Sequence, residues 1–469
     1  MNAHTRASLP RGGARPRLSL WLSLSLSLWV GLVAPHVHSQ DLLETWRLAK
    51  LHDPQYAAAQ AQRDQALVKR DQMAPLWDTQ TRATLAAGLG GQDAHLTNAR
   101  AMGQNGVGFD ASINAGAMAR AAVSTQKPIR NPALDVQSRM LDAGARMGEV
   151  QWQQAQQDLA WRTVQRYFNI VSARQTVQVL QRQHDTLVKA QKEIARRQAI
   201  GDATLMDVQE AQTRVALLNA QILQAQQDVN ALEVAYRQLT GQAPQAMRTV
   251  AEKQNLNVLA DQALPQWLVQ ANAQSAQLQL VDLQIGLQEA DAQRIRLAGT
   301  SPTTDWVGQA QLDRLTGYGM NGTATQQIAG YMMGVQWSMP LGTHNLTMAR
   351  EQEALKQADK LRSDKVLAQS QIEAQVTEAW QAVPSLQARL QALTQAHTLS
   401  QQRLRSTRQA HQVGTRTTLE WLGAEQDAAQ AELQWRLMRI QVLVAQARLA
   451  WASGALGDSQ LQALNQQLQ

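Results

Sequence analysis

The sequence predicts a mainly α-helical protein with a small β part, built from two tandem repeats. Three observations predict this class: landmark residues recur at a fixed offset, apolar residues follow the spacing of long helices, and shorter segments alternate apolar and polar residues. Hydrophobic residues make up 44% of the 469 residues but aromatic residues only 4%, which suits long helices better than a thick aromatic core.

Cysteine content and charge exclude several functions. The chain has no cysteine, so it has no disulfide framework, thiolate metal site, cysteine nucleophile or acylated lipoprotein cysteine. Four of its seven net positive charges come from arginines before residue 40, and no basic block follows them. We therefore expect no nucleic-acid partner. The nine histidines show no metal-ligand spacing and no phosphate loop or nucleophile elbow is present, so we expect no cofactor, no metal and no enzymatic activity.

Residues 1–39 have the features of a signal peptide. The four arginines precede an apolar stretch from Leu18 to Ala34, and small residues stand at Val37 and Ser39, where signal peptidase prefers them. A transmembrane anchor is the alternative, but about 17 residues diluted by serine are short for a span of about 20. We expect cleavage near Ser39 and export of the mature chain from the cytoplasm.

The mature chain consists of two internal repeats, at 40–250 and 251–469. Pro128 matches Pro340 at an offset of 212 residues, and Gly201 matches Gly414 at 213. Each repeat begins with an expected helix, at 41–74 and 265–298, ended by proline or glycine. Two units with the same segment lengths predict two copies of one shape, related by an approximate rotation.

Each repeat then has a pair of expected strands, at about 77–128 and about 305–340. The pattern is clearest between Tyr331 and Met339, where apolar residues alternate with glycine, glutamine and serine. Stretches rich in glycine, asparagine and threonine, at 90–108 and 317–325, are expected as the loops between paired strands. The partner strand at 77–89 is weaker and is expected mainly by repeat symmetry.

A long helical run follows each strand pair, and a shorter helix returns. The first long run covers 133–200, about 100 Å at 1.5 Å per residue, and its return helix covers 205–240. Apolar residues on the return helix are spaced alternately four and three apart, which predicts a coiled-coil seam. Adding 213 to each position gives an apolar residue again. The first seam consists of Ala211, Val215, Leu218, Ile222, Ala225, Val229, Leu232, Tyr236 and Leu239.

Four alternating strands cannot close a membrane barrel alone. An open sheet would leave backbone groups unpaired in lipid, and closed membrane barrels need about eight strands or more. If the strands enter lipid, the protein must be an oligomer of two, three or four copies. The alternative is a soluble four-stranded sheet, which the outward apolar faces disfavour.

The mature chain resembles the TolC family of outer-membrane export channels nearly end to end. The stretches that carry the resemblance are Arg197–Ala211, His411–Thr417 and Ala455–Asn465, and the first two hold glycine turns at a 213-residue offset. The resemblance implies a homotrimer in the outer membrane of a Gram-negative bacterium, with a 12-stranded barrel in outer-membrane lipid continuous with a periplasmic α-helical barrel. It also implies two partners, a periplasmic adaptor (membrane fusion protein) and an inner-membrane transporter of the ABC type.

The turns at about 200–207 and 413–420 carry the expected functional residues. Thr204 with Asp207, and Thr417 with Glu420, have the spacing of capping boxes. The resemblance implies a periplasmic gate formed by Asp207, Arg416, His411 and Glu420, in which Asp207 and Arg416 join neighbouring tip helices and hold the entrance shut. It also implies adaptor-docking tips, which are Ile200, Gly201, Val413, Gly414 and Thr415.

Two departures from the family pattern affect this gate. His411 stands where the family has an aromatic hydroxyl, so that hydrogen bond is expected to be altered or pH-dependent. Gly423 stands where the family has a second acidic ring, so cation selectivity is expected to be weaker.

Three functions remain open at this stage. The second turn and the segment after it look most like members that serve type I protein secretion, including export of RTX-type toxins, so protein export is favoured. Multidrug or small-molecule efflux is the alternative, because efflux members share the architecture. A periplasmic adaptor also carries a long helical hairpin, but it usually has one hairpin framed by β domains, whereas this chain has two framed by strand pairs.

Overall fold

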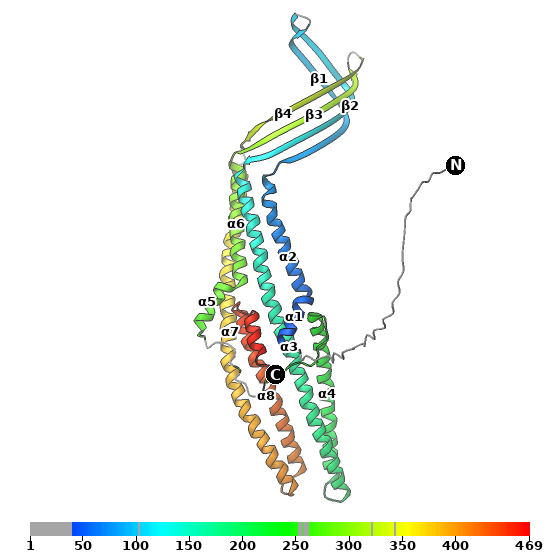
Figure 1. Cartoon of the computed structure of the whole chain (residues 1–469), viewed down its shortest axis with the longest axis vertical. Helices are drawn as coiled ribbons and strands as arrows, with labels where there is room; N and C mark the ends of the chain where they lie inside the picture. Colours follow the sequence, from blue (N-terminus) through cyan, green and yellow to red (C-terminus); the bar gives the residue numbers. More distant parts are fainter. Residues whose placement is uncertain (1–39, 102–103, 252–255, 257–261, 320–321, 342–343) are drawn as a thin grey trace, which may run out of the picture. The chain divides into compact units, whose positions relative to one another are not determined.

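The computed structural model describes residues 40–101, 104–251, 256, 262–319, 322–341 and 344–469, without the side chains of 94–111. The expected signal peptide at 1–39 lies outside these residues. Within the described part, one four-stranded sheet is joined to long helices, and the same order of elements occurs twice (Figure 1). This arrangement confirms the predicted fold class.

Each repeat begins with a helix that stops after 11 residues and restarts. The helices are α1 (Leu42–His52), α2 (Pro54–Arg70), α5 (Leu264–Gln274) and α6 (Ala276–Thr300). The backbone of Asp53 and of Ser275 is extended, and each side chain caps the helix that follows. The Asp53 carboxylate accepts a hydrogen bond from the Tyr56 backbone N–H at 2.8 Å. The expectation of one unbroken helix per repeat was therefore wrong, because an internal capping residue starts a second helix.

The strands are longer than the sequence pattern predicted. They are β1 (Gln80–Ala101), β2 (Gln104–Arg130), β3 (Thr303–Gly319) and β4 (Gly322–Ser338), all antiparallel in the order β1-β2-β3-β4. Strand pairing continues through most of the expected loops at 90–108 and 317–325, since ladder hydrogen bonds from a neighbouring strand outweigh weak local propensity. The predicted start near Trp77 was also wrong, because Trp77 ends a short 3₁₀ helix, η2 (Pro75–Trp77).

The sheet has one apolar and one polar face. Register places Val123, Ala310 and Tyr331 in one row across the sheet, on the apolar face. On the other face, the Arg120 guanidinium donates to the Asp313 carboxylate at 2.6 Å, and the Gln126 amide donates to Asp305 at 2.9 Å. The apolar face is solvent-exposed over much of β1 and β4.

The first long helix and its return helix agree closely with the ranges predicted for them, and the second repeat has helices of matching length. They are α3 (Pro132–Ala199, 68 residues), α4 (Leu205–Thr240, 36 residues), α7 (His344–Gln412, 69 residues) and α8 (Thr418–Ala452, 35 residues). Helix α3 packs against α4 and α8, and α7 packs against α8 and α6. Every position of the two predicted seams is buried or half-buried, which confirms both seams.

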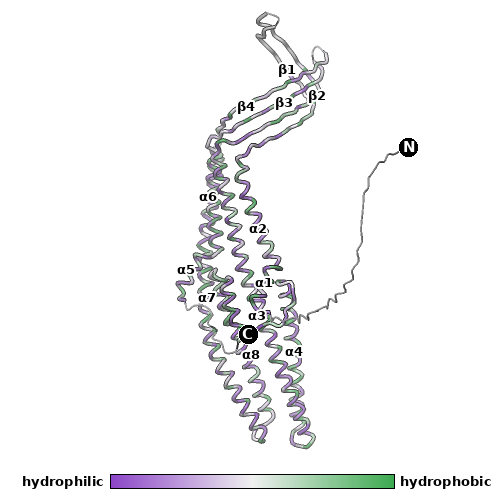
Figure 2. The backbone as a smooth tube through the Cα atoms, viewed as in Figure 1, coloured by the Kyte–Doolittle hydropathy of each residue, from purple (hydrophilic) through white to green (hydrophobic). Residues whose placement is uncertain are grey.

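Hydrophobic and hydrophilic residues are interspersed along the helices, as Figure 2 shows. No helix among the described residues combines the length and the apolar composition needed to cross a membrane.

The first described residues, from Gln40, and the C-terminal residues both bond to the segment that links the two repeats. The Gln40 N–H donates to the Ala246 carbonyl at 2.7 Å, and the Gln469 N–H donates to the Thr249 carbonyl at 2.8 Å. A short final helix, α9 (Asp458–Asn465), adds Asn465, whose side-chain oxygen accepts from the Leu42 N–H at 3.0 Å. These bonds join the first described residues, the linker between repeats and the C-terminal residues around the largest apolar cluster.

Candidate functional site: the two hairpin turns

The first turn joins α3 to α4 through a left-handed glycine. Gly201 has φ of +88°, a conformation that side chains other than glycine rarely adopt. Its N–H donates to the Gln198 carbonyl at 3.1 Å, and the Asp202 N–H donates to the Arg197 carbonyl at 2.8 Å. These bonds satisfy carbonyls at the end of α3, as expected for a glycine at a helix C-terminus.

Thr204 and Asp207 then start α4 as a capping box. The Asp207 N–H donates to the Thr204 hydroxyl at 3.1 Å, while the Asp207 carboxylate accepts from the Thr204 hydroxyl at 2.7 Å and from its N–H at 2.9 Å. These hydrogen bonds, the hydroxyl first, hold the pKa of Asp207 below its usual value of 3.8. The structure therefore supports the capping role of Asp207 directly.

The second turn repeats this geometry. Gly414 has φ of +78°, its N–H donates to the His411 carbonyl at 3.1 Å, and the Thr415 N–H donates to the Ala410 carbonyl at 2.9 Å. The Glu420 carboxylate accepts from the Thr417 N–H at 2.8 Å and from the Arg416 guanidinium at 2.5 Å. The Thr417 backbone N–H is the main reason that the pKa of Glu420 falls to about 2, and Arg416 adds to it.

Both turns expose matching pairs of apolar side chains. Ile200 is 75% exposed and Met206 76%, while Val413, at the matching position to Ile200, is 74% exposed and Leu419, matching Met206, is 50% exposed. Sequence analysis named Ile200 and Val413 but missed Met206 and Leu419. The 213-residue offset, which places an apolar residue at both positions, could have found them.

His411 is the one expected gate residue that is buried. Its side chain is 8% exposed, its ring stacks on Trp421 of α8 with centroids 5.1 Å apart, and its Nε2 lies 3.2 Å from the Thr418 hydroxyl. Burial lowers the pKa of His411 below 6.5, and the nearby charge of Arg197 lowers it further. The printed contacts of the His411 ring, with Trp421 and Thr418, both lie within its own hairpin.

The remaining gate residues stay in their own turns. Asp207 bonds to Thr204, and Arg416 bonds to Glu420 four residues along. The chain thus pairs each with a local partner, and the expected contact between Asp207 and Arg416 of neighbouring tip helices stays a prediction.

Leu422 provides an apolar contact between the hairpins that sequence analysis missed. This α8 residue is buried in an apolar cluster otherwise drawn from the first hairpin, with Leu187 and Ile194 of α3 and Leu218 of α4. Spacing along one helix could not reveal it, because the partners lie more than 200 residues earlier in the chain.

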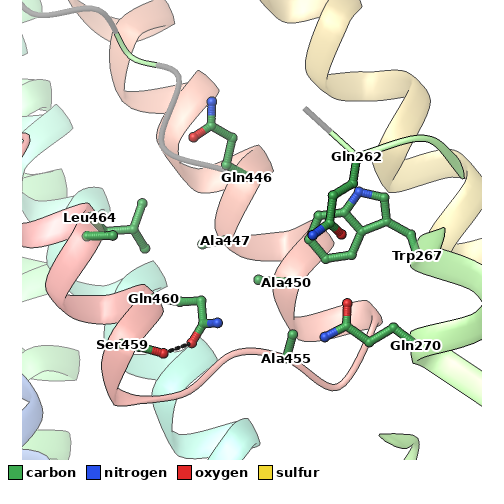
Figure 3. Close-up of a pocket in the computed structure, with 11 residues that line it drawn as sticks. Gln262, Trp267, Gln270, Gln446, Ala447, Ala450, Ala455, Ser459, Gln460 and Leu464 are labelled. Atoms are coloured by element: carbon green, nitrogen blue, oxygen red, sulfur yellow. Dashed lines mark hydrogen bonds between the residues drawn. The ribbon is translucent and has the colours of Figure 1, made fainter. Parts of the chain in front are cut away.

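One cavity in the described part of the chain is lined without charged side chains. It measures about 250 Å³ and lies between α5, α8 and α9, where Trp267, Gln270 and Gln460 face it (Figure 3). Its lining is glutamine, serine, alanine, leucine and tryptophan, so it holds no charged or metal-binding side chain. Across the described residues, no group of three or more His, Cys, Asp or Glu could hold a metal ion.

Comparison with known proteins finds similarity in structure but not in sequence. No protein-family model matches the sequence, and no curated protein matches it significantly. Among solved structures, CusC aligns with a TM-score of 0.70 at 14% identity, over 89% of this chain and 92% of CusC. The CmeC outer membrane channel of Campylobacter jejuni aligns with a TM-score of 0.70 at 12% identity, over 92% and 91% of the two chains.

A third structure extends this likeness. The MtrE outer membrane channel of Neisseria gonorrhoeae, in its open state, aligns with a TM-score of 0.63 at 16% identity, over 88% of this chain and 89% of MtrE. Each of these three alignments covers at least 88% of both chains. The protein therefore has the fold of the TolC family of outer-membrane channels.

Proposed function

We propose that the protein is the outer-membrane channel of a tripartite export system, working as a homotrimer. The observation that carries this proposal is the sheet, which has an exposed apolar face, a polar face and two edges without a partner strand among the described residues. In that part of the chain β1 pairs only with β2, and β4 only with β3, which leaves strand edges of 22 and 17 residues open. Long open edges invite pairing with other chains, and in lipid they must close.

Three copies would close the sheet into 12 strands. The β4 edge of one copy would pair with the β1 edge of the next, and the polar face with Arg120 and Asp313 would line the interior. Even-numbered barrels with a polar interior and an apolar exterior are the form that outer-membrane proteins take. Because the two edges of the sheet differ, the contact joins unlike surfaces and generates a ring.

Aromatic residues on the apolar face support the membrane placement. Trp306 and Trp337 lie near the helical end of the sheet, and Tyr318 lies on the same face 12 residues beyond Trp306. Twelve residues span about 40 Å along a strand, or about 28 Å vertically at a tilt of about 45°, close to the apolar band of about 25 Å between aromatic girdles. Arg314, on this face near Tyr318, can extend its guanidinium to the interface.

The helices expose apolar side chains that contacts between neighbouring copies would bury. α4 exposes Leu217, Leu223 and Val234, and α7 exposes Val366 and Leu399. Within the described residues, α4 packs mainly on α3, and α7 packs mainly on α8 and α6. Contact between α7 of one copy and α4 of the next would bury these residues and continue the sheet closure as a helical barrel.

The turns would then form the periplasmic end of the channel. Ile200, Gly201, Val413, Gly414 and Thr415 would dock a periplasmic adaptor, and Asp207, Arg416, His411 and Glu420 would form the gate. The exposed apolar pairs of the two turns suit a protein partner, since buried apolar contact is the main source of association energy. The adaptor would connect the channel to an inner-membrane transporter of the ABC type.

We propose protein as the cargo, as in type I secretion. This part of the proposal rests on the resemblance of the second turn to that class, and small-molecule efflux is the alternative. A deletion strain distinguishes the two: loss of one secreted protein from the medium supports protein export, while unchanged secretion with greater drug sensitivity supports efflux.

Fractionation and conductance test the channel itself. The processed protein should fractionate with the outer membrane, have the mass of a trimer in detergent, and conduct ions in planar bilayers. A single-copy species without conductance would contradict the proposal, and an inner-membrane or soluble species would favour an adaptor.

A further inference from the structure

Gln40, which follows the expected cleavage site at Ser39, is held in a buried site on the linker between the repeats. It is 6% exposed. Its N–H donates to the Ala246 carbonyl at 2.7 Å and its carbonyl accepts from the Arg248 N–H at 3.2 Å, which makes a parallel β-bridge with the linker. The Tyr167 hydroxyl lies 3.3 Å from the same carbonyl. The backbone of Gln40 therefore has a partner for both its donor and its acceptor.

The side chain of Gln40 is held by its oxygen. Oε1 accepts from the Gln245 N–H at 2.9 Å and from the hydroxyl of Tyr236, a fully buried residue, at 3.4 Å. The side-chain nitrogen Nε2 makes no hydrogen bond to another described residue. The site thus binds the carbonyl of the side-chain amide and leaves its amino group without a described partner.

A free N-terminus at Gln40 fits this site poorly. Cleavage after Ser39 turns the backbone nitrogen into an α-amine, which is largely protonated at neutral pH because its pKa is about 7.7–8.0. An α-ammonium brings a positive charge and three donors, which are costly to bury without partners. The carboxylate of the adjacent Asp41 already accepts from the Glu44 N–H at 2.8 Å and from the Asn465 amide at 3.0 Å. The site suits a neutral group with one N–H.

We propose that Gln40 of the processed chain is converted to pyroglutamate and that its lactam ring occupies this site. In this step the α-amine nitrogen forms a bond to the side-chain carbon Cδ. The Cδ–Nε2 bond breaks, and Nε2 leaves as ammonia with a proton from the α-amine. No atom is oxidised or reduced, so the step needs no co-reactant, and it joins two groups of one residue, which proximity favours.

The lactam keeps each atom of Gln40 that the site binds. Its single N–H remains for the Ala246 carbonyl, its ring carbonyl for Gln245 and Tyr236, and its backbone carbonyl for Arg248. The atom that is lost, Nε2, is the one without a described partner. Cyclisation precedes docking, since the docked residue is buried. The inference rests on the expected export and cleavage of the chain and does not depend on channel activity.

Mass spectrometry of the mature N-terminus tests the modification. The chain is produced with its own leader in a Gram-negative bacterium, purified from the envelope and digested with trypsin. The first peptide should run from Gln40 to Arg47 and be lighter than its unmodified form by one ammonia. A synthetic peptide of the same sequence, labelled with heavy isotopes and added before digestion with a free glutamine, measures any cyclisation during handling.

Pyroglutamyl aminopeptidase tests the docking. The enzyme should remove the first residue from the unfolded protein and fail to remove it from the folded protein. Tyr236→Phe takes away the hydroxyl on Oε1 and should raise the rate of removal from the folded protein. Tyr56→Phe is the matched control, since Tyr56 is also a buried tyrosine of the central cluster but packs on Trp152. It should keep the wild-type protection.

A further variant measures what the ring contributes. Gln40→Asn cannot close this ring, because its side chain is one carbon shorter, so its processed chain keeps the α-amine. We expect a lower midpoint of thermal unfolding than in wild type. An unchanged midpoint would overturn the claim that the site requires the neutral lactam.

Each remaining outcome also decides. A wild-type chain that begins at Gln40 with a free amine, or that begins at another residue, overturns the inference. Equal removal of pyroglutamate from folded and unfolded protein overturns the docking. A protein that carries the protected ring but never conducts ions contradicts the proposed channel and keeps this inference, whereas a conducting protein with an unmodified Gln40 does the reverse.

Discussion

Leu422 is the apolar side chain by which the second hairpin enters the cluster of the first, so its truncation tests whether that contact holds the turns together. It is 2% exposed and packs among residues of α3 and α4. A cavity of about 110 Å³ lies beside it, lined by Leu187, Leu218 and Gln426 among others. We expect Leu422→Ala to enlarge this cavity and weaken the contact between the hairpins.

The size of the effect follows from burial. Leucine-to-alanine changes in a packed core cost about 2–5 kcal/mol. If about 1.5 kcal/mol of this cost falls on the contact between hairpins, the equilibrium between docked and released turns shifts about tenfold in each chain. In the proposed trimer the three chains shift together, so the effect on opening is larger than in one chain.

Two measurements follow the released turn. Hydrogen exchange at pH 7.5 should show lower protection of residues 413–424 and of the end of α3 in Leu422→Ala. Planar-bilayer recording should show more frequent or larger openings at the same protein density. Leu443→Ala is the matched control, since Leu443 is a fully buried leucine on the same helix that packs in the central cluster.

The reasoning would be refuted by a control that behaves like the variant. If Leu443→Ala loosens the turns as much as Leu422→Ala does, the effect reflects general destabilisation of α8. If Leu422→Ala lowers the midpoint of thermal unfolding while exchange at the turns stays at the wild-type level, Leu422 supports the fold and does not join the hairpins.

Three further predictions concern the turns. Gly201→Ala should lower the free energy of unfolding by about 1–2 kcal/mol, because an alanine at φ of +88° is strained. Gly286→Ala, in an open helix interior, should raise the free energy of unfolding slightly. Thermal unfolding measures both variants, and equal effects would contradict the strain argument. Glu420→Gln should lower the midpoint of thermal unfolding, and its difference from wild type should be greatest above pH 4.5 and vanish as pH falls through about 2. The reason is that capping lowers the pKa of the Glu420 carboxylate. A difference that does not depend on pH would argue against this cap. Asp207→Ala combined with Arg416→Ser should give a leaky pore of higher conductance in planar bilayers, and unchanged conductance would remove both residues from the gate.

The sequence alone was sufficient for features that depend on local chemistry. The range of α4, the seam on each return helix and both capping boxes follow from residues within a few turns of one another, and the structure confirms them. The helix breaks at Asp53 and Ser275 also depend on local chemistry, although sequence analysis did not predict them. Each has a capping residue inside an apolar run, and Pro54 strengthens the first signal.

Only the tertiary structure decided which distant segments meet. Strand β1 runs on through Gly90 and Gly91 because β2 supplies hydrogen bonds that no local preference could predict. Leu422 contacts the first hairpin because α8 packs on α3, and nothing in the spacing along α8 encodes that choice of neighbour. Local spacing fixes each helix and turn, whereas burial shared between segments more than 200 residues apart fixes how the two hairpins meet.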